Sequence, residues 1–133
     1  MHVEAYGTTF TIDESLVAES PAEIRRQVRE YERGERREFD LTVTPPDDFT
    51  GAVMEAMAAI PRGETRTYGD LAAELDSAAV AVGQACGRNP VPIVVPCHRV
   101  VGADSLGGFS NESDDPVGVK RRLLDQEGAI DEE

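Results

Sequence analysis

Residues 88–102 read Arg-Asn-Pro-Val-Pro-Ile-Val-Val-Pro-Cys-His-Arg-Val-Val-Gly, and they lead to a cysteine followed by a histidine. The Asn-Pro pair near the start is typical of the end of a helix, because proline cannot continue one. The apolar residues 91–95 then predict a short buried strand that runs into Cys97. Nucleophilic enzymes use a cysteine with a nearby histidine, since a neighbouring base activates the thiol. Cys97 is therefore a candidate nucleophile and His98 its candidate base.

The chain contains two cysteines, Cys86 and Cys97, and two histidines, His2 and His98. These are too few cysteines for a disulfide framework, and a four-ligand zinc site would have to recruit His2 or carboxylates. We therefore expect no metal ion and no cofactor. The alternative to a nucleophile is a buried structural Cys97 beside a surface histidine.

Upstream of this stretch the apolar residues follow helical spacing. They predict one helix over residues 49–60, which ends before Pro61. A second helix is expected from the capping residue Thr67 to about residue 75, and a third, made almost wholly of small residues, from Ala78 to about residue 86. Two short helices joined by a tight turn form a helix-turn-helix, although many helical hairpins bind nothing and a small-residue helix is more often core packing.

The flanking segments are more polar. They predict a hairpin over residues 3–12, a capped helix over about residues 21–33, a strand over residues 39–43, a linker over residues 44–48 and a last helix over residues 117–127. The fold class is therefore α+β. We expect a small N-terminal lobe over residues 1–48 and a mainly helical domain over residues 49–133.

The net charge of −13 comes from 26 acidic residues against 13 lysines and arginines. Proteins that hold DNA usually carry a basic face, so this balance argues against a nucleic-acid partner unless salt screens the charges. We hypothesise a halophilic, salt-loaded cytoplasm, in which acidic surfaces keep proteins soluble and a basic footprint contributes little. An ordinary acidic protein from a low-salt cell is the alternative. Residues 60–110, with four arginines and five acids, are the least acidic part and the best suited to touch a polyanion.

The chain has no run of eighteen apolar residues, and its first residues lack a basic stretch followed by an apolar one. We expect a cytoplasmic monomer that does not bind membranes.

Residues 96–100, Pro-Cys-His-Arg-Val, resemble the signature of the O6-alkylguanine-DNA alkyltransferases. Further stretches match this family in the same order and lie within roughly residues 24–130: residues 60–65, 68–72, 81–83, 88–93 and 123–128. The resemblance implies a mainly helical catalytic domain with a winged-helix-like helix-turn-helix, preceded here by a truncated α/β lobe. It also implies irreversible, single-turnover transfer of an alkyl group from guanine O6 in double-stranded DNA to Cys97, after the base is flipped out from the minor groove.

The resemblance implies a role for each catalytic residue. Cys97 attacks the alkyl carbon, His98 takes the thiol proton through a water molecule, and Glu127 orients the imidazole and stabilises its charge. Tyr68 donates a hydrogen bond to the purine, which favours the neutral leaving group. A half-buried core tyrosine is the alternative for Tyr68.

Substrate and DNA contacts are implied in the same way. The backbone of Val100 accepts from the exocyclic amine, Ser110 offers a backbone donor to O6, and Phe109 and Cys86 form the pocket wall. The third helix is the recognition helix in the minor groove, where small side chains let its backbone approach the sugars. Asn89 ties together the turn between this helix and the active-site stretch. The expected DNA contacts are Ala78, Ala79, Val80, Gly83, Arg88, Asn89 and Arg99.

The sequence departs from the family where the base is delivered. Val80 stands where the family carries an arginine that fills the gap left by the flipped nucleotide. An apolar wedge can unstack a base step, but it cannot hydrogen bond to the orphaned base. Phe109 replaces a common tyrosine, Cys86 replaces a larger apolar residue, and Asn111 replaces the first of a glycine pair beside the acidic residues 112–115. We expect inefficient flipping from duplex DNA, and an N-terminal lobe that affects stability without touching the chemistry.

Two other functions fit parts of the pattern. Alkyltransferase-like proteins bind alkylated guanine and recruit excision repair without transferring the alkyl group. They usually lack the cysteine, so Cys97 argues against this class while Val80 leaves it open. A helix-turn-helix regulator that senses redox state or alkylation through Cys97 would need long polar side chains for major-groove readout. The third helix has almost none.

Overall fold

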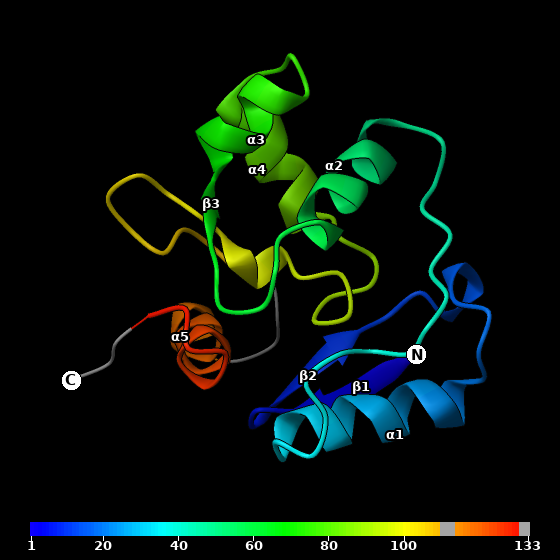
Figure 1. Ribbon diagram of the computed structural model, residues 1–133. Helices are drawn as coiled ribbons and strands as arrows, with labels where there is room; N and C mark the ends of the chain where they lie inside the picture. Colours follow the sequence, from blue (N-terminus) through cyan, green and yellow to red (C-terminus); the bar gives the residue numbers. More distant parts are fainter. Residues whose placement is uncertain (110–113, 131–133) are drawn as a thin grey trace.

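The structure, a computed structural model, describes residues 1–109 and 114–130 as a mixed α+β fold, as expected. Its elements in chain order are β1 (His2–Ala5), β2 (Thr8–Thr11), the 3-10 helix η1 (Glu14–Leu16), α1 (Pro21–Glu32), α2 (Phe49–Ala58), β3 (Arg66–Thr67), α3 (Tyr68–Glu74), α4 (Ala79–Gly87), the 3-10 helix η2 (Cys97–Arg99), β4 (Val100–Val101) and α5 (Pro116–Gln126). Helices α2, α3 and α4 gather at one end and β1, β2 and α1 at the other (Figure 1). The yellow η2 segment lies between the two ends (Figure 1).

The N-terminal lobe consists of a hairpin and one helix packed against it. β1 and β2 pair antiparallel, as the sequence predicts. Helix α1 begins after Ser20, whose side chain accepts a hydrogen bond from the backbone N–H of Glu23 at 3.2 Å. Ile24, Val28 and Tyr31 follow at helical spacing and are buried. The lobe therefore directs Tyr31 toward the interior of the molecule.

The helix-turn-helix is formed by α3 and α4, which pack against each other. A capping box starts α3: the Thr67 side chain accepts from the Asp70 N–H, and the Asp70 carboxylate accepts from the Thr67 N–H, both at 3.0 Å. Asp76, with a φ of 52°, makes the tight turn into α4. The helices predicted from spacing and capping are thus confirmed, with ends that differ by one or two residues.

Residues 91–95 were expected to form a strand, and this prediction is wrong. They turn back on themselves instead, so that the N–H of Val95 donates to the carbonyl of Val91 at 2.9 Å. Ile93 adopts a φ of 74°, which extended backbone does not allow. The physical reason is the prolines at positions 90, 92 and 96, which lack the N–H groups that a strand ladder needs.

Residues 39–43 also do not form the predicted strand. They run as an irregular segment in which Val43 makes an isolated bridge with Val17. The structure instead contains a short parallel pair that the sequence did not predict, β3 with β4, which joins the start of α3 to the end of η2. Two-residue strands are too short to carry an alternating pattern.

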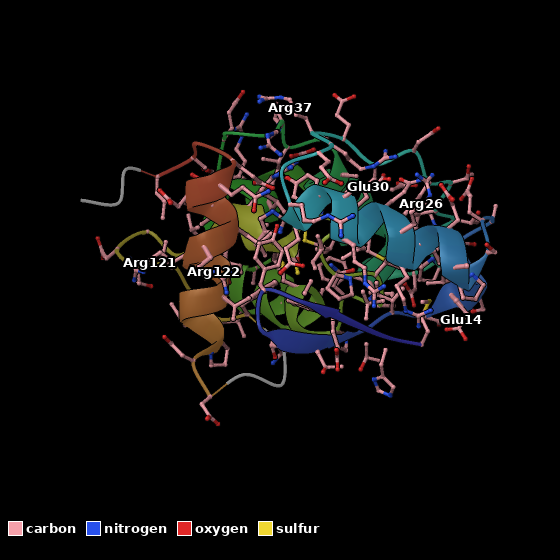
Figure 2. The ribbon with its side chains drawn as sticks, turned by 90° about the horizontal axis from the view of Figure 1, so that it is seen from below. Glu14, Arg26, Glu30, Arg37, Arg121 and Arg122 are labelled. Atoms are coloured by element: carbon pink, nitrogen blue, oxygen red, sulfur yellow. The ribbon has the colours of Figure 1, made fainter. Side chains whose placement is uncertain are left out.

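One hydrophobic core runs through both ends of the molecule. It includes Ile24 and Tyr31 from α1, Met57 from α2 and Leu123 from α5. Helix α5 is also tied to the hairpin, because Arg122 Nη1 donates to the carbonyl of Tyr6 at 2.9 Å. Figure 2 shows Arg122 on the hairpin side of α5. The domain boundary at residue 48 stays a prediction.

Charged side chains on α1 largely pair with one another. Arg26 and Arg36 donate to the two carboxylate oxygens of Glu30, at 2.8 and 3.1 Å (Figure 2).

Within the described ranges, no helix is both long and apolar enough to span a membrane.

Candidate active site

Cys97 opens η2 and lies against a cavity of about 320 Å³. The cavity is lined by Tyr68, Gly83, Cys86, Gly87, Cys97, Gly108 and Phe109. Only 7% of Cys97 is exposed, and burial raises the pKa of its thiol, although a hydrogen bond with Asn89 and the charge of Lys120 oppose the increase. The resting thiol is therefore neutral and needs a base to become a nucleophile.

His98 supplies a base next in sequence. Its ring is fully buried, and Nε2 lies 2.8 Å from Glu127 Oε2. Burial lowers the pKa of His98, and the neighbouring carboxylate opposes this shift. A neutral imidazole that donates from Nε2 has its lone pair on Nδ1, and His98 Nδ1 has no hydrogen-bond partner among the described residues. His98 can therefore accept a proton at Nδ1 while Glu127 balances the resulting charge.

The carboxylate of Glu127 bonds to the side chains of Arg99, Tyr31 and His98. Arg99 donates to its two carboxylate oxygens from Nε and Nη2, at 3.0 and 3.1 Å, and the Tyr31 hydroxyl donates to Oε2. These bonds and the one from His98 lower the pKa of Glu127 to about 2, against the effect of burial. The carboxylate is therefore ionised at neutral pH, and its orientation is set from several directions.

Tyr31 is a site residue that the sequence analysis missed. It belongs to α1, so the N-terminal lobe reaches the carboxylate of Glu127, the residue predicted to orient His98, and this contact was not expected from the sequence. The helical spacing of Ile24, Val28 and Tyr31 is the signal that could have indicated an inward-facing Tyr31. Nothing in the sequence indicated that its hydroxyl would meet Glu127.

Lys120 is the second missed residue, although it is the only lysine in the chain. It is fully buried, and Nζ donates to the carbonyls of Val100 at 2.6 Å and Gly108 at 3.0 Å. Nζ also lies 5.8 Å from the ring centroid of Tyr68. Burial lowers the pKa of Lys120 to about 8. The Val100 carbonyl, expected to accept from the substrate amine, thus already accepts from Lys120.

We expect Lys120→Met to slow alkylation of Cys97 at pH 7 by about tenfold, the equivalent of one pKa unit. The nearby ammonium lowers the pKa of the Cys97 thiol, so its removal raises that pKa and shifts the rate profile toward higher pH. The measurement is the rate of transfer from free O6-benzylguanine between pH 6 and pH 9. Arg121→Met on the same helix is the control for a general loss of positive charge. An unchanged profile in Lys120→Met contradicts the prediction.

Tyr68 lies at the start of α3 with its ring across the cavity. A Cβ built on Gly107 would approach the Tyr68 hydroxyl to 2.5 Å, and Gly107 has a φ of 75°. Glycine is therefore required at position 107 for both backbone conformation and space. Burial raises the pKa of Tyr68, and a hydrogen bond from the Gly108 N–H opposes the shift, so the phenol stays protonated at neutral pH.

Asn89 holds the turn that leads from α4 to η2. Its Nδ2 donates to the carbonyl of Val95 at 2.9 Å, and its Oδ1 accepts from the N–H of Val91 at 3.1 Å. These two bonds replace backbone bonds that the prolines cannot make. Asn89 also makes a side-chain hydrogen bond with Cys97, so it links the turn to the predicted nucleophile.

Four of the five predicted DNA contacts in and beside α4 are exposed, and Gly83 is the exception. Ala78, Ala79 and Val80 are exposed at the N-terminal end, with 73% of Val80 exposed, and Arg88 is exposed at the other end. Gly83 faces inward, and a Cβ built on it would lie 3.9 Å from a ring carbon of Tyr68. The N-terminal end of α4 therefore carries an exposed apolar side chain, that of Val80.

Three other predicted site residues are Arg99, Ser110 and Phe109. Arg99 was expected to contact DNA, but its guanidinium is part-buried and donates to Glu127 and to the carbonyl of Ile60 at 2.8 Å. We reassign Arg99 to the support of Glu127. Ser110 lies outside the described residues, as do Asn111 and residues 112–113 of the acidic segment. Phe109 is buried, lines the cavity and meets the His98 ring edge-on at 6.3 Å.

Residues 48–129 match the family described as 6-O-methylguanine DNA methyltransferase, DNA binding domain. The chain belongs to this family. The match covers the helix-turn-helix, the turn at Asn89, the Cys97 region and α5 with Glu127.

Individual relatives agree with this assignment. The methylated-DNA–protein-cysteine methyltransferase of Archaeoglobus fulgidus is 40% identical over 131 residues, which are 96% of this chain and 86% of the relative. The constitutive methylated-DNA–protein-cysteine methyltransferase of Bacillus subtilis is 41% identical over 123 residues, which are 88% of this chain and 73% of the relative. A Mycobacterium tuberculosis OGT crystallised in complex with DNA matches with a TM-score of 0.71 at 40% identity, over 81% of this chain and 67% of that chain. The expected fold class is thereby confirmed.

Proposed function

We propose that this protein repairs DNA by transferring the alkyl group of O6-alkylguanine to its own Cys97, once and irreversibly. The observation that carries the proposal is a buried thiol that lines the cavity, next in sequence to a buried histidine whose Nδ1 has no partner among the described residues and whose Nε2 bonds to an ionised carboxylate. A thiol, a base and an orienting carboxylate are the three parts of an activated nucleophile.

The reaction follows from these groups. The Cys97 thiol proton passes to His98 Nδ1 through a water molecule, and Glu127 stabilises the imidazolium that forms. The thiolate then attacks the alkyl carbon in line with the leaving O6. A sulfur–carbon bond forms, the carbon–O6 bond breaks, and its electron pair moves into the purine. The Tyr68 hydroxyl, protonated at neutral pH, donates to the purine as that charge develops.

Delivery of the base is assigned to α4. Its small exposed residues Ala78 and Ala79 allow close approach to the minor groove, and Val80 projects from the same end as an apolar wedge. The target nucleotide must leave the stack, because Cys97 lies inside the protein. The partner we propose is therefore double-stranded DNA that contains O6-alkylguanine.

The deciding experiment is incubation of the protein with O6-benzylguanine, and separately with an O6-methylguanine duplex, followed by peptide mass spectrometry. The proposal requires stoichiometric alkylation of Cys97 by both substrates. Tight binding of the damaged duplex without any adduct would instead support a damage-sensing relative of the alkyltransferase-like class. Alkylation at a residue other than Cys97 would also overturn the assignment.

We expect Val80→Arg to raise the rate of transfer from duplex O6-methylguanine by about tenfold, because an inserted arginine can hydrogen bond to the orphaned base while a valine cannot. The rate with free O6-benzylguanine should stay the same, since no flipping is involved. Gln84→Arg, also exposed on α4, is the matched control for added positive charge. The prediction fails if both variants accelerate duplex repair equally.

The charge of −13 carries a prediction about salt. If the acidic surface is an adaptation to a salt-loaded cell, transfer to Cys97 should persist in molar KCl, where the Debye length is only about 3 Å. The comparisons do not support this hypothesis, which stays a prediction. Rates with free O6-benzylguanine from 0.1 M to 3 M KCl test it. A maximum below about 0.2 M with collapse at high salt would favour an ordinary acidic protein.

A further inference from the structure

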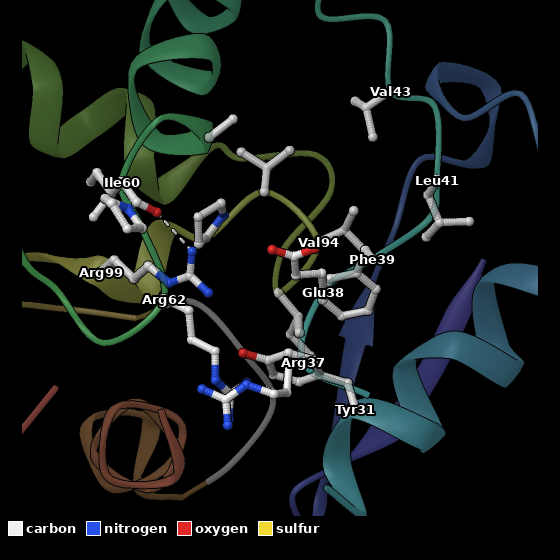
Figure 3. A pocket seen from close by; sticks show the side chains of 15 residues that line it. Tyr31, Arg37, Glu38, Phe39, Leu41, Val43, Ile60, Arg62, Val94 and Arg99 are labelled. Carbon is white, nitrogen blue, oxygen red and sulfur yellow. Dashed lines mark hydrogen bonds between the residues drawn. The ribbon is translucent and has the colours of Figure 1, made fainter. Parts of the chain in front are cut away.

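A second cavity, of about 410 Å³, lies where the segment after α1 crosses the helical domain. Phe39, Leu41 and Val43 line it from this segment, and Ile60 and Val94 line it from the helical domain (Figure 3). None of its lining residues also lines the cavity above Cys97. It is therefore a separate cavity, although Tyr31 and Arg99, which donate to Glu127, also line it.

The charged lining of this second cavity is cationic. Arg37, Arg62 and Arg99 line it, against the single carboxylate of Glu38. In Figure 3 Arg62 and Arg99 lie on the helical-domain side beside Ile60, whereas Arg37 comes from the segment that also carries Leu41 and Val43. Three cations in one cavity are unexpected in a chain with a net charge of −13. The cavity thus combines an apolar wall with a cationic one.

The arginines differ in how far their donors are used. Arg99 is committed, since all three of its side-chain nitrogens donate to Glu127 or Ile60. Arg62 donates from Nη2 to the carbonyl of Gln126 at 3.3 Å, whereas its Nε and Nη1 are buried without a hydrogen-bond partner in the described part of the chain. Nε–H and Nη1 lie on opposite sides of the Cζ–Nε bond, so they are two separate unpartnered donors and not one bidentate edge.

Arg37 offers a second cation at the mouth of the cavity. It is exposed, and no ion pair or hydrogen bond of its side chain occurs among the described residues, unlike Arg26 and Arg36 nearby. The Arg62 guanidinium is itself fixed, because it stacks 5.2 Å from the ring centroid of Tyr31. One cation is therefore preorganised inside the cavity and the other is free to close over a ligand.

We propose that this cavity binds a small organic anion, with a carboxylate or phosphate monoester head on a short aromatic or branched apolar body. The head is held by Arg62 and Arg37, and the body packs on Phe39, Ile60 and Val94. A cavity of this volume is within the range of small-molecule sites, which are mostly apolar with a few polar groups that fix orientation. The unpartnered donors of Arg62 supply that orientation, and the hydrocarbon wall disfavours a fully hydrated inorganic ion.

The test is calorimetric titration of the full chain at constant ionic strength with four probes: phenylacetate, phenyl phosphate, benzyl alcohol and inorganic phosphate. At least one aryl anion should bind one to one with a dissociation constant of about 1 mM or tighter. The two aryl anions distinguish a carboxylate from a phosphate head. Benzyl alcohol and inorganic phosphate each lack one half of the recognised chemistry and should bind at least about tenfold more weakly.

Variants assign the binding to this cavity. Arg62→Gln and Arg37→Gln should each weaken the aryl anion by about tenfold or more, whereas Arg33→Gln, an exposed residue paired with Glu35, should leave it unchanged. Arg37 is exposed, so its replacement tests the proposal even if Arg62→Gln folds poorly. No saturable binding of either aryl anion overturns the proposal. Equal binding of benzyl alcohol, or unchanged affinity in Arg37→Gln, overturns it as well.

Discussion

Cys97→Ser is expected to abolish alkyl transfer completely while the protein still binds an O6-methylguanine duplex. A serine hydroxyl is a far weaker nucleophile than a thiol, and its proton is too tightly held for a neutral imidazole to remove in this setting. The side chains have nearly the same shape, so the cavity and its lining should be preserved. Peptide mass spectrometry should find no alkylated residue after prolonged incubation with O6-benzylguanine.

The control for this prediction is Cys86→Ser. Cys86 lines the same cavity, but burial raises the pKa of its thiol to about 12, so it is no competing nucleophile at neutral pH. Cys86→Ser should therefore still become alkylated at Cys97. Binding to the damaged duplex, measured by fluorescence anisotropy, should be retained by Cys97→Ser. An adduct that persists in Cys97→Ser would place the acceptor elsewhere and refute the mechanism.

Glu127→Gln is expected to have the second largest effect, on stability and on activity together. The amide leaves the part-buried Arg99 without an anion, and removal of one partner from a buried pair costs about 3–5 kcal/mol. The imidazolium of His98 also loses its charge partner, so transfer should slow by about 100-fold or more. Urea unfolding and the rate with O6-benzylguanine are the two measurements.

The low pKa of Glu127 predicts the direction in which stability changes with pH. The pKa of Glu127 is about 2 in the folded protein, below its ordinary value of 4.5, so the unfolded chain binds more protons between these values. The contribution of the ionised Glu127 to stability should therefore be fully present above about pH 4.5 and be lost as the pH drops toward 2. Glu127→Gln should lack this pH-dependent loss. Glu64→Gln, which removes an exposed partner of Arg66, is the control and should change little. Identical acid unfolding of the wild type and Glu127→Gln would contradict the assignment.

The role of the N-terminal lobe follows from the same network. Tyr31 belongs to α1, yet its hydroxyl donates to Glu127, and Phe39 stacks on the Tyr31 ring at 4.8 Å. Burial raises the pKa of Tyr31 to about 12, so it remains a donor at neutral pH. The lobe therefore helps to set the orientation of the carboxylate that bonds to His98.

The sequence by itself determined the helices and the order of the catalytic motifs. Caps such as Ser20 and Thr67 bond to groups three residues away, and helical spacing repeats within a few residues, so both are readable along the chain. Cys97 and His98 are adjacent in sequence, so their pairing can be predicted without knowledge of the fold.

Only the tertiary structure decided which groups surround the reacting atoms. Tyr31 and Glu127 are 96 positions apart, and Lys120 meets the carbonyl of Val100 from 20 positions away. The sequence predicted that Arg99 contacts DNA, whereas the structure places its part-buried guanidinium against Glu127. The reason is that a buried charge must find its partners wherever packing places them, since leaving it unpaired is too costly. The motifs therefore predicted the nucleophile, whereas packing determined the network that sets its reactivity.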